Sequence, residues 1–208
     1  WMTHFAIGGS AKCCLEQEDE FLKTISLLGF RQGESVSYSN SDAIIFNPKF
    51  SSDWVRPGIL LYGAPTSLDP KGKMDKFLKL LNPCQTLQTQ VIAIQTVKTG
   101  EGIGYGKTHI ASKDMLVGIA AIGYADGYPR SIKQGTHCIV QGKRCQIIGV
   151  VSMDLIHIDL SECPEATIGS KVECWGKNLP ILEVAQSSGR LCYELFTGIT
   201  SRVTREIN

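Results

Sequence analysis

Residues 55–62 read VRPGILLY, and this stretch decides which kind of fold the chain can form. Apart from Arg56 and the Pro–Gly pair, the stretch is apolar, which is typical of a strand buried on both faces of a sheet. Strands of that kind belong to parallel sheets whose faces are covered by helices. The stretch therefore predicts a strand over residues 55–62, within a parallel sheet or at the edge of a barrel.

Two shorter strand candidates and one helix candidate precede this stretch. Residues 2–6 (MTHFA) and 35–38 read as strands, and apolar residues at helical spacing predict a helix over residues 16–28. Gly29 follows that helix as its C-cap, and Asn40 with Ser41 is typical of the start of a helix. Strands alternating with helical connections indicate an α/β arrangement for residues 1–81.

The pattern changes near residue 82, where NPC follows an apolar helix candidate at residues 74–81. Alternating apolar residues predict a strand over residues 86–97, and a short apolar run predicts another over residues 117–122. Residues 138–148 contain Gln-Gly between two apolar arms and predict a hairpin, while residues 180–186 predict one short helix. We therefore expect a second, mainly β domain over residues 82–208.

The composition excludes several classes of partner. The chain of 208 residues has 21 Lys and Arg against 20 Asp and Glu, and no long basic run, so we expect neither a nucleic acid nor a membrane surface as partner. No apolar stretch approaches the ~18 residues of a membrane-spanning helix, so we expect a cytoplasmic protein. The eight cysteines and four histidines lack the paired spacing of a zinc site, so we expect no metal.

Individual polar residues support both a structural and a functional interpretation. His4 lies between apolar neighbours, where a hydrogen-bonded core histidine is more common than a catalyst. Arg56 lies inside an apolar stretch and needs an anion or an acceptor as partner, because burying a guanidinium is costly.

The stretch IAAIGYADGYPR at residues 119–130 places Tyr124 where a strand ends and a turn at Asp126–Gly127 begins. Ends of strands are rigid and loops are open, so such a position suits a functional side chain as well as a half-buried tyrosine at the rim of a hairpin. The glycine-rich stretch GIGYGKT at residues 102–108 lacks the spacing of a phosphate-binding loop.

Taken in order, the motifs of this chain resemble those of the pyridoxal-phosphate-dependent alanine racemases from residue 2 to the end. They are MTHFA, NS, VRPGILLYG, GIGYGKT, IGYADGYPR, VSMD, ECWG and YELFTGITSRVTR. The resemblance implies the C-terminal strands of a TIM-type α/β barrel in residues 1–81 and a β domain in residues 82–208. It also implies an isomerase that interconverts L- and D-alanine with pyridoxal 5'-phosphate (PLP) and supplies D-alanine for cell-wall peptidoglycan.

Two alternatives stay open at this point. One is a serine or broad-specificity amino-acid racemase of the same fold, and the other is a non-catalytic remnant that serves dimerisation or binding. The resemblance further implies that about five strand–helix units, including the lysine that holds PLP, precede residue 1. No lysine in this chain lies in that lysine's family context, KANAYGHG.

The resemblance assigns the catalytic roles to three residues. Tyr105 matches the catalytic tyrosine, which in the family's homodimer reaches the active site of the partner subunit and moves the α-proton on one face of the substrate. His4 matches the histidine beside that tyrosine, and Arg56 matches the arginine that contacts the pyridine nitrogen of PLP.

Further residues match the binding positions of the family. The cofactor's phosphate side is matched by Asn40, Ser41, the backbone amides of Gly58 and Ile59, and the hydroxyl of Tyr193. The substrate side is matched by Tyr124 at the entrance and by the backbone amide of Met153. Two positions depart from the family: Ser37 replaces a histidine that supports the arginine, and Val150 replaces an arginine near the entrance.

Overall fold

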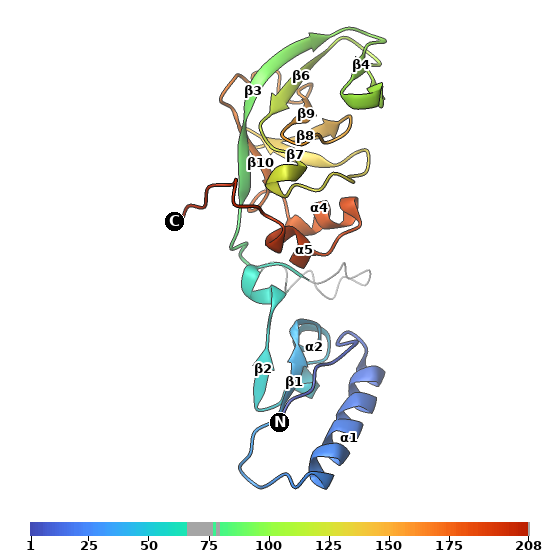
Figure 1. Ribbon diagram of the computed structural model, residues 1–208, viewed down its shortest axis with the longest axis vertical. Helices are drawn as coiled ribbons and strands as arrows, with labels where there is room; N and C mark the ends of the chain where they lie inside the picture. Colours follow the sequence, from blue (N-terminus) through green and yellow to red (C-terminus); the bar gives the residue numbers. More distant parts are fainter. Residues whose placement is uncertain (66–76, 78–79, 208) are drawn as a thin grey trace. The chain divides into compact units, whose positions relative to one another are not determined.

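The computed structural model describes residues 1–65, 77 and 80–207, which form two compact units, Trp1–Asn82 and Pro83–Asn208. The two units are described separately below and are drawn together in Figure 1. The helix predicted over residues 74–81 lies largely outside the described residues.

The first unit combines a small parallel sheet with helices (Figure 1). Strands β1 and β2 pair in parallel, and Met2 forms an isolated parallel bridge to Ser37 of β1. The elements are α1 (Ala11–Leu27), β1 (Ser37–Asn40), α2 (Ser41–Phe46), a 3-10 helix η1 (Pro48–Phe50), β2 (Trp54–Arg56) and a 3-10 helix η2 (Ile59–Tyr62). The predicted parallel pairing is thereby confirmed.

Helix α1 begins earlier than the apolar spacing predicted, because Ser10 caps it. The Ser10 hydroxyl accepts a hydrogen bond from the Cys13 N–H at 3.3 Å, which satisfies one of the free amides of the first turn. At the other end Gly29 has a φ of 87°, as expected for the residue that ends a helix. The helix buries Cys14 against a core that contains Phe5, whose ring lies 5.2 Å from that of Tyr38.

The predicted strand over residues 55–62 is wrong for most of its length. Strand β2 ends at Arg56, because Pro57 has no N–H to continue the ladder, and Ile59–Tyr62 then form η2. The side chains are not buried on both faces either, since Val55 is 44% and Leu61 67% exposed. The strand predicted over MTHFA is reduced to the single bridge at Met2.

The second unit is built around a closed β-barrel with the strand order β10-β3-β6-β9-β8-β7 (Figure 1). Its strands are β3 (Leu87–Val97), β6 (Met115–Ala120), β7 (His137–Val140), β8 (Lys143–Ile148), β9 (Ile156–Asp159) and β10 (Lys171–Trp175). A separate hairpin joins β4 (Gly102–Ile103) to β5 (His109–Ile110), and two 3-10 helices, η3 (Tyr105–Lys107) and η4 (Tyr124–Asp126), follow β4 and β6. Helices α4 (Ile181–Ser188) and α5 (Cys192–Thr197) complete the unit.

Turn chemistry explains the hairpin that the sequence predicted at residues 138–148. Gln141 and Gly142 both have positive φ, 48° and 82°, which joins β7 and β8 through the tightest kind of hairpin turn. The mainly β character of this unit is confirmed. Helix α5 was missed, because the sequence predicted a single helix in this region.

Candidate functional site

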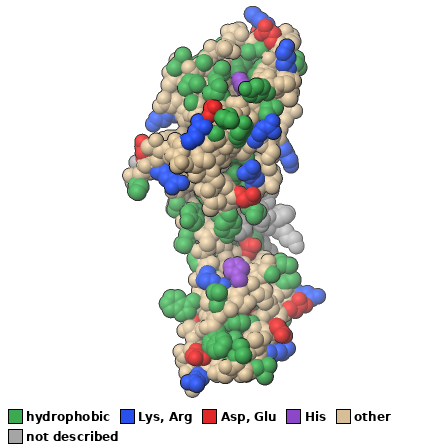
Figure 2. Space-filling model, viewed as in Figure 1, with side chains coloured by type: hydrophobic (Ala, Val, Ile, Leu, Met, Phe, Trp, Pro, Cys, Tyr) green, Lys and Arg blue, Asp and Glu red, His purple; other side chains and the backbone are tan. Residues whose placement is uncertain are grey.

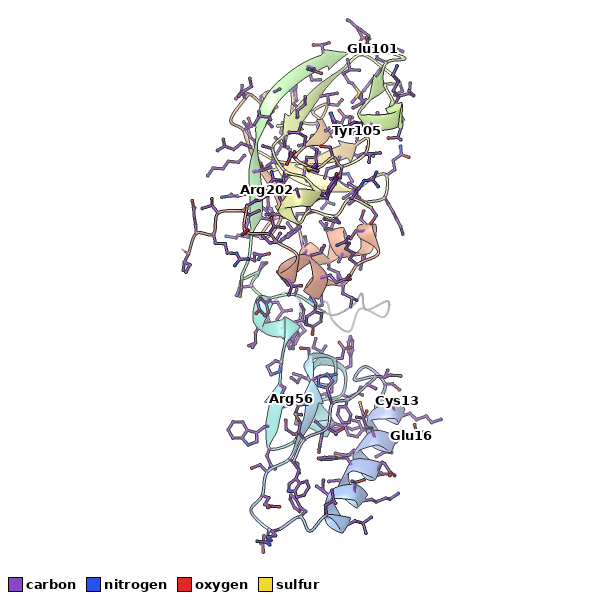
Figure 3. The ribbon with its side chains drawn as sticks, viewed as in Figure 1. Cys13, Glu16, Arg56, Glu101, Tyr105 and Arg202 are labelled. Carbon is purple, nitrogen blue, oxygen red and sulfur yellow. The ribbon has the colours of Figure 1, made fainter. Side chains whose placement is uncertain are left out.

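Arg56 is the centre of a polar cluster in the first unit, and Figure 3 shows it at the end of β2. One terminal nitrogen of its guanidinium donates to the hydroxyl of Ser37, and the other donates to the carbonyl oxygen of Thr3 at 2.6 Å. The second nitrogen also lies 3.3 Å from Nδ1 of His4. Both oxygen atoms that accept from the Arg56 guanidinium are therefore uncharged. One of them is the hydroxyl of Ser37, the residue that replaces the histidine of the resembling family.

His4 lies between two hydrogen-bond donors. Its Nδ1 faces Arg56, and its Nε2 lies 3.3 Å from the amide nitrogen of Asn40. The Asn40 amide is oriented by its other bonds, because its Oδ1 accepts from the Ala43 N–H and its Nδ2 donates to the Phe5 carbonyl. The cluster thus brings together the guanidinium of Arg56, the imidazole of His4 and the side-chain amide of Asn40. The side chain is exposed, and the interpretation of His4 as a core histidine is wrong.

Ser41 and Gly58 form a second polar group in the same unit. Ser41 is 3% exposed at the start of α2, and its hydroxyl accepts the Gly58 N–H at 3.0 Å. Asn40 caps the helix, so the predicted helix start is confirmed within one residue. The N–H of Ile59 has no hydrogen-bond partner in the described part of the chain. The group combines a hydroxyl with backbone N–H donors, which is the donor set that an oxyanion requires.

Tyr105 lies in the turn between β4 and β5 in the second unit, where it is 76% exposed (Figure 3). Gly104 on one side has φ 70° and ψ −171°, and Gly106 on the other has φ 68°, so both neighbours adopt conformations that favour glycine. A Cβ at Gly104 would lie 3.6 Å from the imidazole of His157 and 3.8 Å from the backbone nitrogen of Val150. The turn therefore packs against His157 of β9 and against Val150, the residue that replaces an arginine of the resembling family.

His157 is a partly buried titratable group beneath this turn. Its Nδ1 has no hydrogen-bond partner among the described residues, and burial lowers the pKa of His157 below its ordinary value. Sequence reasoning missed this residue, because a histidine inside an alternating strand pattern carries no signal of its own.

The turns that carry Tyr124 and Met153 are joined by their backbones. The Tyr124 N–H donates to the Ser152 carbonyl and the Ala125 N–H to the Met153 carbonyl, each at 3.0 Å. A Cβ at Gly123 would lie 2.3 Å from the Met153 oxygen, so only glycine permits this approach. Tyr124 and Met153 are 41% and 52% exposed, and the Met153 N–H has no partner within the described residues.

Three charged residues connect the same two turns to the C-terminal segment. Arg202 bonds Oδ1 of Asp154 through one terminal nitrogen at 2.6 Å, and its Nε lies 3.4 Å from Oδ1 of Asp126. The other oxygen of Asp126 accepts the Gly123 N–H at 2.8 Å. Sequence reasoning missed these contacts, although all three residues lie inside the motifs ADG, SMD and TSR.

Tyr193 lies on α5, where it is 43% exposed. No hydrogen bond joins Tyr105 or Tyr193 to any other predicted site residue within the described part of the chain. The structure thus brings the predicted residues together as two sets, the cluster around Arg56 with the Ser41 group in the first unit and the turns of Tyr124 and Met153 in the second.

On the face shown in Figure 2, the charged side chains of the described residues do not gather into a patch of one sign. Figure 2 shows basic and acidic side chains interspersed over the visible face of each unit. The helices among the described residues include none that is long and apolar enough to cross a membrane. Those residues also contain no group of three His, Cys, Asp or Glu side chains able to hold a metal ion.

Two family profiles match this chain. The profile "Alanine racemase, C-terminal domain" matches residues 84–207, and the profile "Alanine racemase, N-terminal domain" matches residues 1–66. Among similar sequences, the alanine racemase of Wigglesworthia glossinidia brevipalpis is 43% identical over 99% of this chain and 56% of its own length. The catabolic alanine racemase of Salmonella typhimurium is 41% identical over 97% of this chain and 55% of its own length.

Solved structures resemble the chain over nearly its whole length. The biosynthetic alanine racemase of Pseudomonas aeruginosa has a TM-score of 0.86 and 38% identity, over 99% of this chain and 56% of that structure. The alanine racemase of Bacillus anthracis with bound L-Ala-P has a TM-score of 0.81 and 34% identity, over 97% of this chain and 53% of that structure. The chain therefore spans about half the length of the proteins that it matches, 56% of the first.

Proposed function

Because this chain belongs to the alanine racemase family, we propose that the complete protein is a PLP-dependent racemase that interconverts L- and D-alanine. The match of both family profiles in their order carries this proposal. We assign residues 1–81 to the PLP-binding barrel and residues 82–208 to the C-terminal β domain. The product D-alanine would supply cell-wall peptidoglycan, and the enzyme would work in the cytoplasm.

The polar groups of the first unit fit PLP. The guanidinium of Arg56 can only donate hydrogen bonds, which suits a pyridine nitrogen that stays unprotonated. The Ser41 hydroxyl and the N–H groups of Gly58 and Ile59 suit the phosphate. Asn40 caps α2 through the Ala43 N–H and so fixes the helix start where Ser41 lies. We assign His4 and Tyr193 to the same cofactor site on the motif match alone.

When bound, PLP supplies an electron sink for the electrons left at the substrate's Cα after deprotonation. Arg56 tunes that chemistry, because it is held by Ser37 and Thr3 and cannot give its proton to the pyridine nitrogen. The Met153 N–H, which has no partner in the described structure, binds the substrate carboxylate, and Tyr124 narrows the entrance. Tyr105 moves the Cα proton on one face through its hydroxyl.

We further propose that the enzyme is a homodimer in which Tyr105 serves the active site of the partner subunit. The high exposure of Tyr105, 76%, supports this arrangement, because a proton-transfer group has to be enclosed before it works. Sedimentation equilibrium of the complete protein tests the proposal, and a monomer that retains full activity would contradict it.

The substitution Tyr105→Phe in the complete enzyme tests the proposed function. Loss of one proton-transfer group should reduce racemisation by about 10²–10⁴-fold, while the absorbance of bound PLP stays unchanged. Deuterium incorporation from solvent is measured separately for each enantiomer, and it should fall for one enantiomer more than for the other.

Tyr62→Phe is the matched control, since it removes another exposed tyrosine hydroxyl that has no proposed role, and it should leave both exchange rates unchanged. Undiminished exchange from both enantiomers in Tyr105→Phe would overturn the assignment of Tyr105. A wild-type enzyme that does not racemise alanine would overturn the function itself.

A further inference from the structure

Arg202, labelled in Figure 3, lies in the C-terminal segment. Among the described residues it is the one cation that bonds both Asp126 and Asp154, although both aspartates are far from it in sequence. Asp126 closes the turn that carries Tyr124, because its carboxylate accepts the Gly123 N–H. Asp154 directly follows Met153 in the other turn. We call these three side chains the Arg202 bracket. The bracket ties the two turns of the proposed substrate side to the C-terminal segment.

Backbone contacts show that the bracket holds a tightly packed junction. The Thr200 N–H donates to the Asp126 carbonyl at 3.2 Å, and the Thr200 hydroxyl donates to the Ala125 carbonyl at 2.8 Å. A Cβ at Gly127 would lie 2.3 Å from the Gly198 oxygen. The turn after Tyr124 is thus fixed by the C-terminal segment on one side and by Ser152 and Met153 on the other.

The charges of the bracket explain why a cation is needed there. The side chain of Asp126 is only 13% exposed, whereas those of Arg202 and Asp154 are about half exposed, 50% and 52%. Two carboxylates share one guanidinium, so removing the guanidinium leaves two like charges facing each other across the two turns. Their repulsion acts between the turn of Tyr124 and the turn of Met153.

We propose that Arg202 is a positioning residue for substrate binding, which sets the Met153 amide and the Tyr124 side chain through Asp154 and Asp126. This inference rests on the proposed function, because Met153 and Tyr124 are assigned to the substrate there. Arg202 itself has no contact with reacting atoms in the proposal. Its loss therefore weakens the binding of the substrate carboxylate more than it slows proton transfer.

The test uses the complete enzyme with four changes. Arg202→Met keeps the length of the side chain and removes its charge, and Arg202→Lys keeps the charge without the forked geometry. The double variant Arg202→Met with Asp154→Asn removes the repulsion as well. Arg144→Met is the matched control, because it breaks an exposed ion pair to Glu183 of the same 2.6 Å length.

Two readouts are measured for every variant. One is KM and kcat for alanine, and the other is hydrogen exchange of the hydrogen-bonded backbone amides of the two turns, at residues 123–126, 152 and 155. Arg202→Met should raise KM by about 10-fold or more with kcat changed by less than about 3-fold, and it should speed exchange at both turns. Arg202→Lys should lie between it and the wild type, and the double variant should recover part of the lost protection. Arg144→Met should change neither readout.

Unchanged exchange at both turns in Arg202→Met, or a loss of kcat with KM unchanged, would overturn the proposal. If Arg202→Met does not fold, Arg202→Lys and the double variant decide between the same outcomes. Failure of the proposed function is distinguishable from failure of the proposal for Arg202. In the first case the wild-type enzyme would lack alanine racemisation, while hydrogen exchange would still report on the Arg202 bracket.

Discussion

At the scale of single residues, glycine decides whether the proposed substrate turns can form. Gly127 has a φ of 102°, and a side chain there would meet the backbone of Gly198 and Ile199. Gly142 has a similar φ of 82°, but a Cβ there would meet nothing within 4 Å. The two positions share the backbone requirement and differ only in the space around them.

This difference gives a prediction for Gly127→Ala and its control Gly142→Ala. The control carries only the cost of a left-handed conformation, about 1 kcal/mol. Gly127→Ala adds a clash with backbone that cannot rotate away, so it should lower the free energy of unfolding by about 3 kcal/mol or more. Urea denaturation of both variants checks this. Equal losses would mean that the contact with Gly198 relaxes freely.

At the scale of elements, strand β9 and the β4–β5 hairpin form one packing unit around His157. His157 pairs with Ile119 of β6 and Ile148 of β8, and Ile148 belongs to the apolar cluster that also contains Ile103 of β4. The histidine thus lies beside apolar side chains beneath the turn of Tyr105. Burial is what lowers its pKa, since it disfavours the charged imidazolium.

The lowered pKa of His157 predicts how stability depends on pH. The unfolded chain takes up a proton at His157 near pH 6.5, whereas the folded chain takes it up only at lower pH. Below pH 6.5 the unfolded state therefore binds more protons, so stability should fall as pH falls from about 6.5 towards the lowered pKa.

Thermal denaturation between pH 7.5 and pH 5 measures this dependence. His157→Gln cannot titrate and should flatten the fall in stability. A profile for His157→Gln as steep as that of the wild type would show that other groups cause the pH dependence.

At the scale of the whole molecule, the two units differ in how completely each buries its own apolar surface. The barrel of the second unit is closed, so it has no open strand edge, and its core includes Trp175 and Tyr128 with stacked rings. The sheet of the first unit has two strands, and the unit exposes Leu27, Met2 and Trp54 by 88%, 67% and 67%. Two-stranded sheets are marginally stable alone.

We therefore predict that residues 83–208 fold on their own and residues 1–82 do not. The isolated second unit should unfold in one cooperative thermal transition, followed by circular dichroism, and the isolated first unit should show none. A cooperative transition for residues 1–82 alone, or its absence for residues 83–208, would contradict the prediction.

Local sequence patterns predicted much of the fold. The alternating strand at Leu87–Val97, the Gln-Gly hairpin and helix α1 follow from periodicity and turn chemistry, which act between near neighbours. The order of the motifs also determined the family, and with it the proposed roles of residues such as Tyr105 and Arg56. The prediction of a strand over residues 55–62 failed, because apolar composition alone does not indicate that the chain leaves the strand at Pro57 and forms a 3-10 helix.

Tertiary structure alone decided which polar groups meet. That Ser37 and Thr3 hold Arg56, that both nitrogens of His4 face donors, and that Arg202 joins Asp126 to Asp154 all depend on segments far apart in the chain. Hydrogen bonds and ion pairs act over a few ångströms, and a sequence pattern records spacing along the chain, not distance through space. The sequence by itself thus determined the family and the local elements, while folding determined the contacts that position the proposed site.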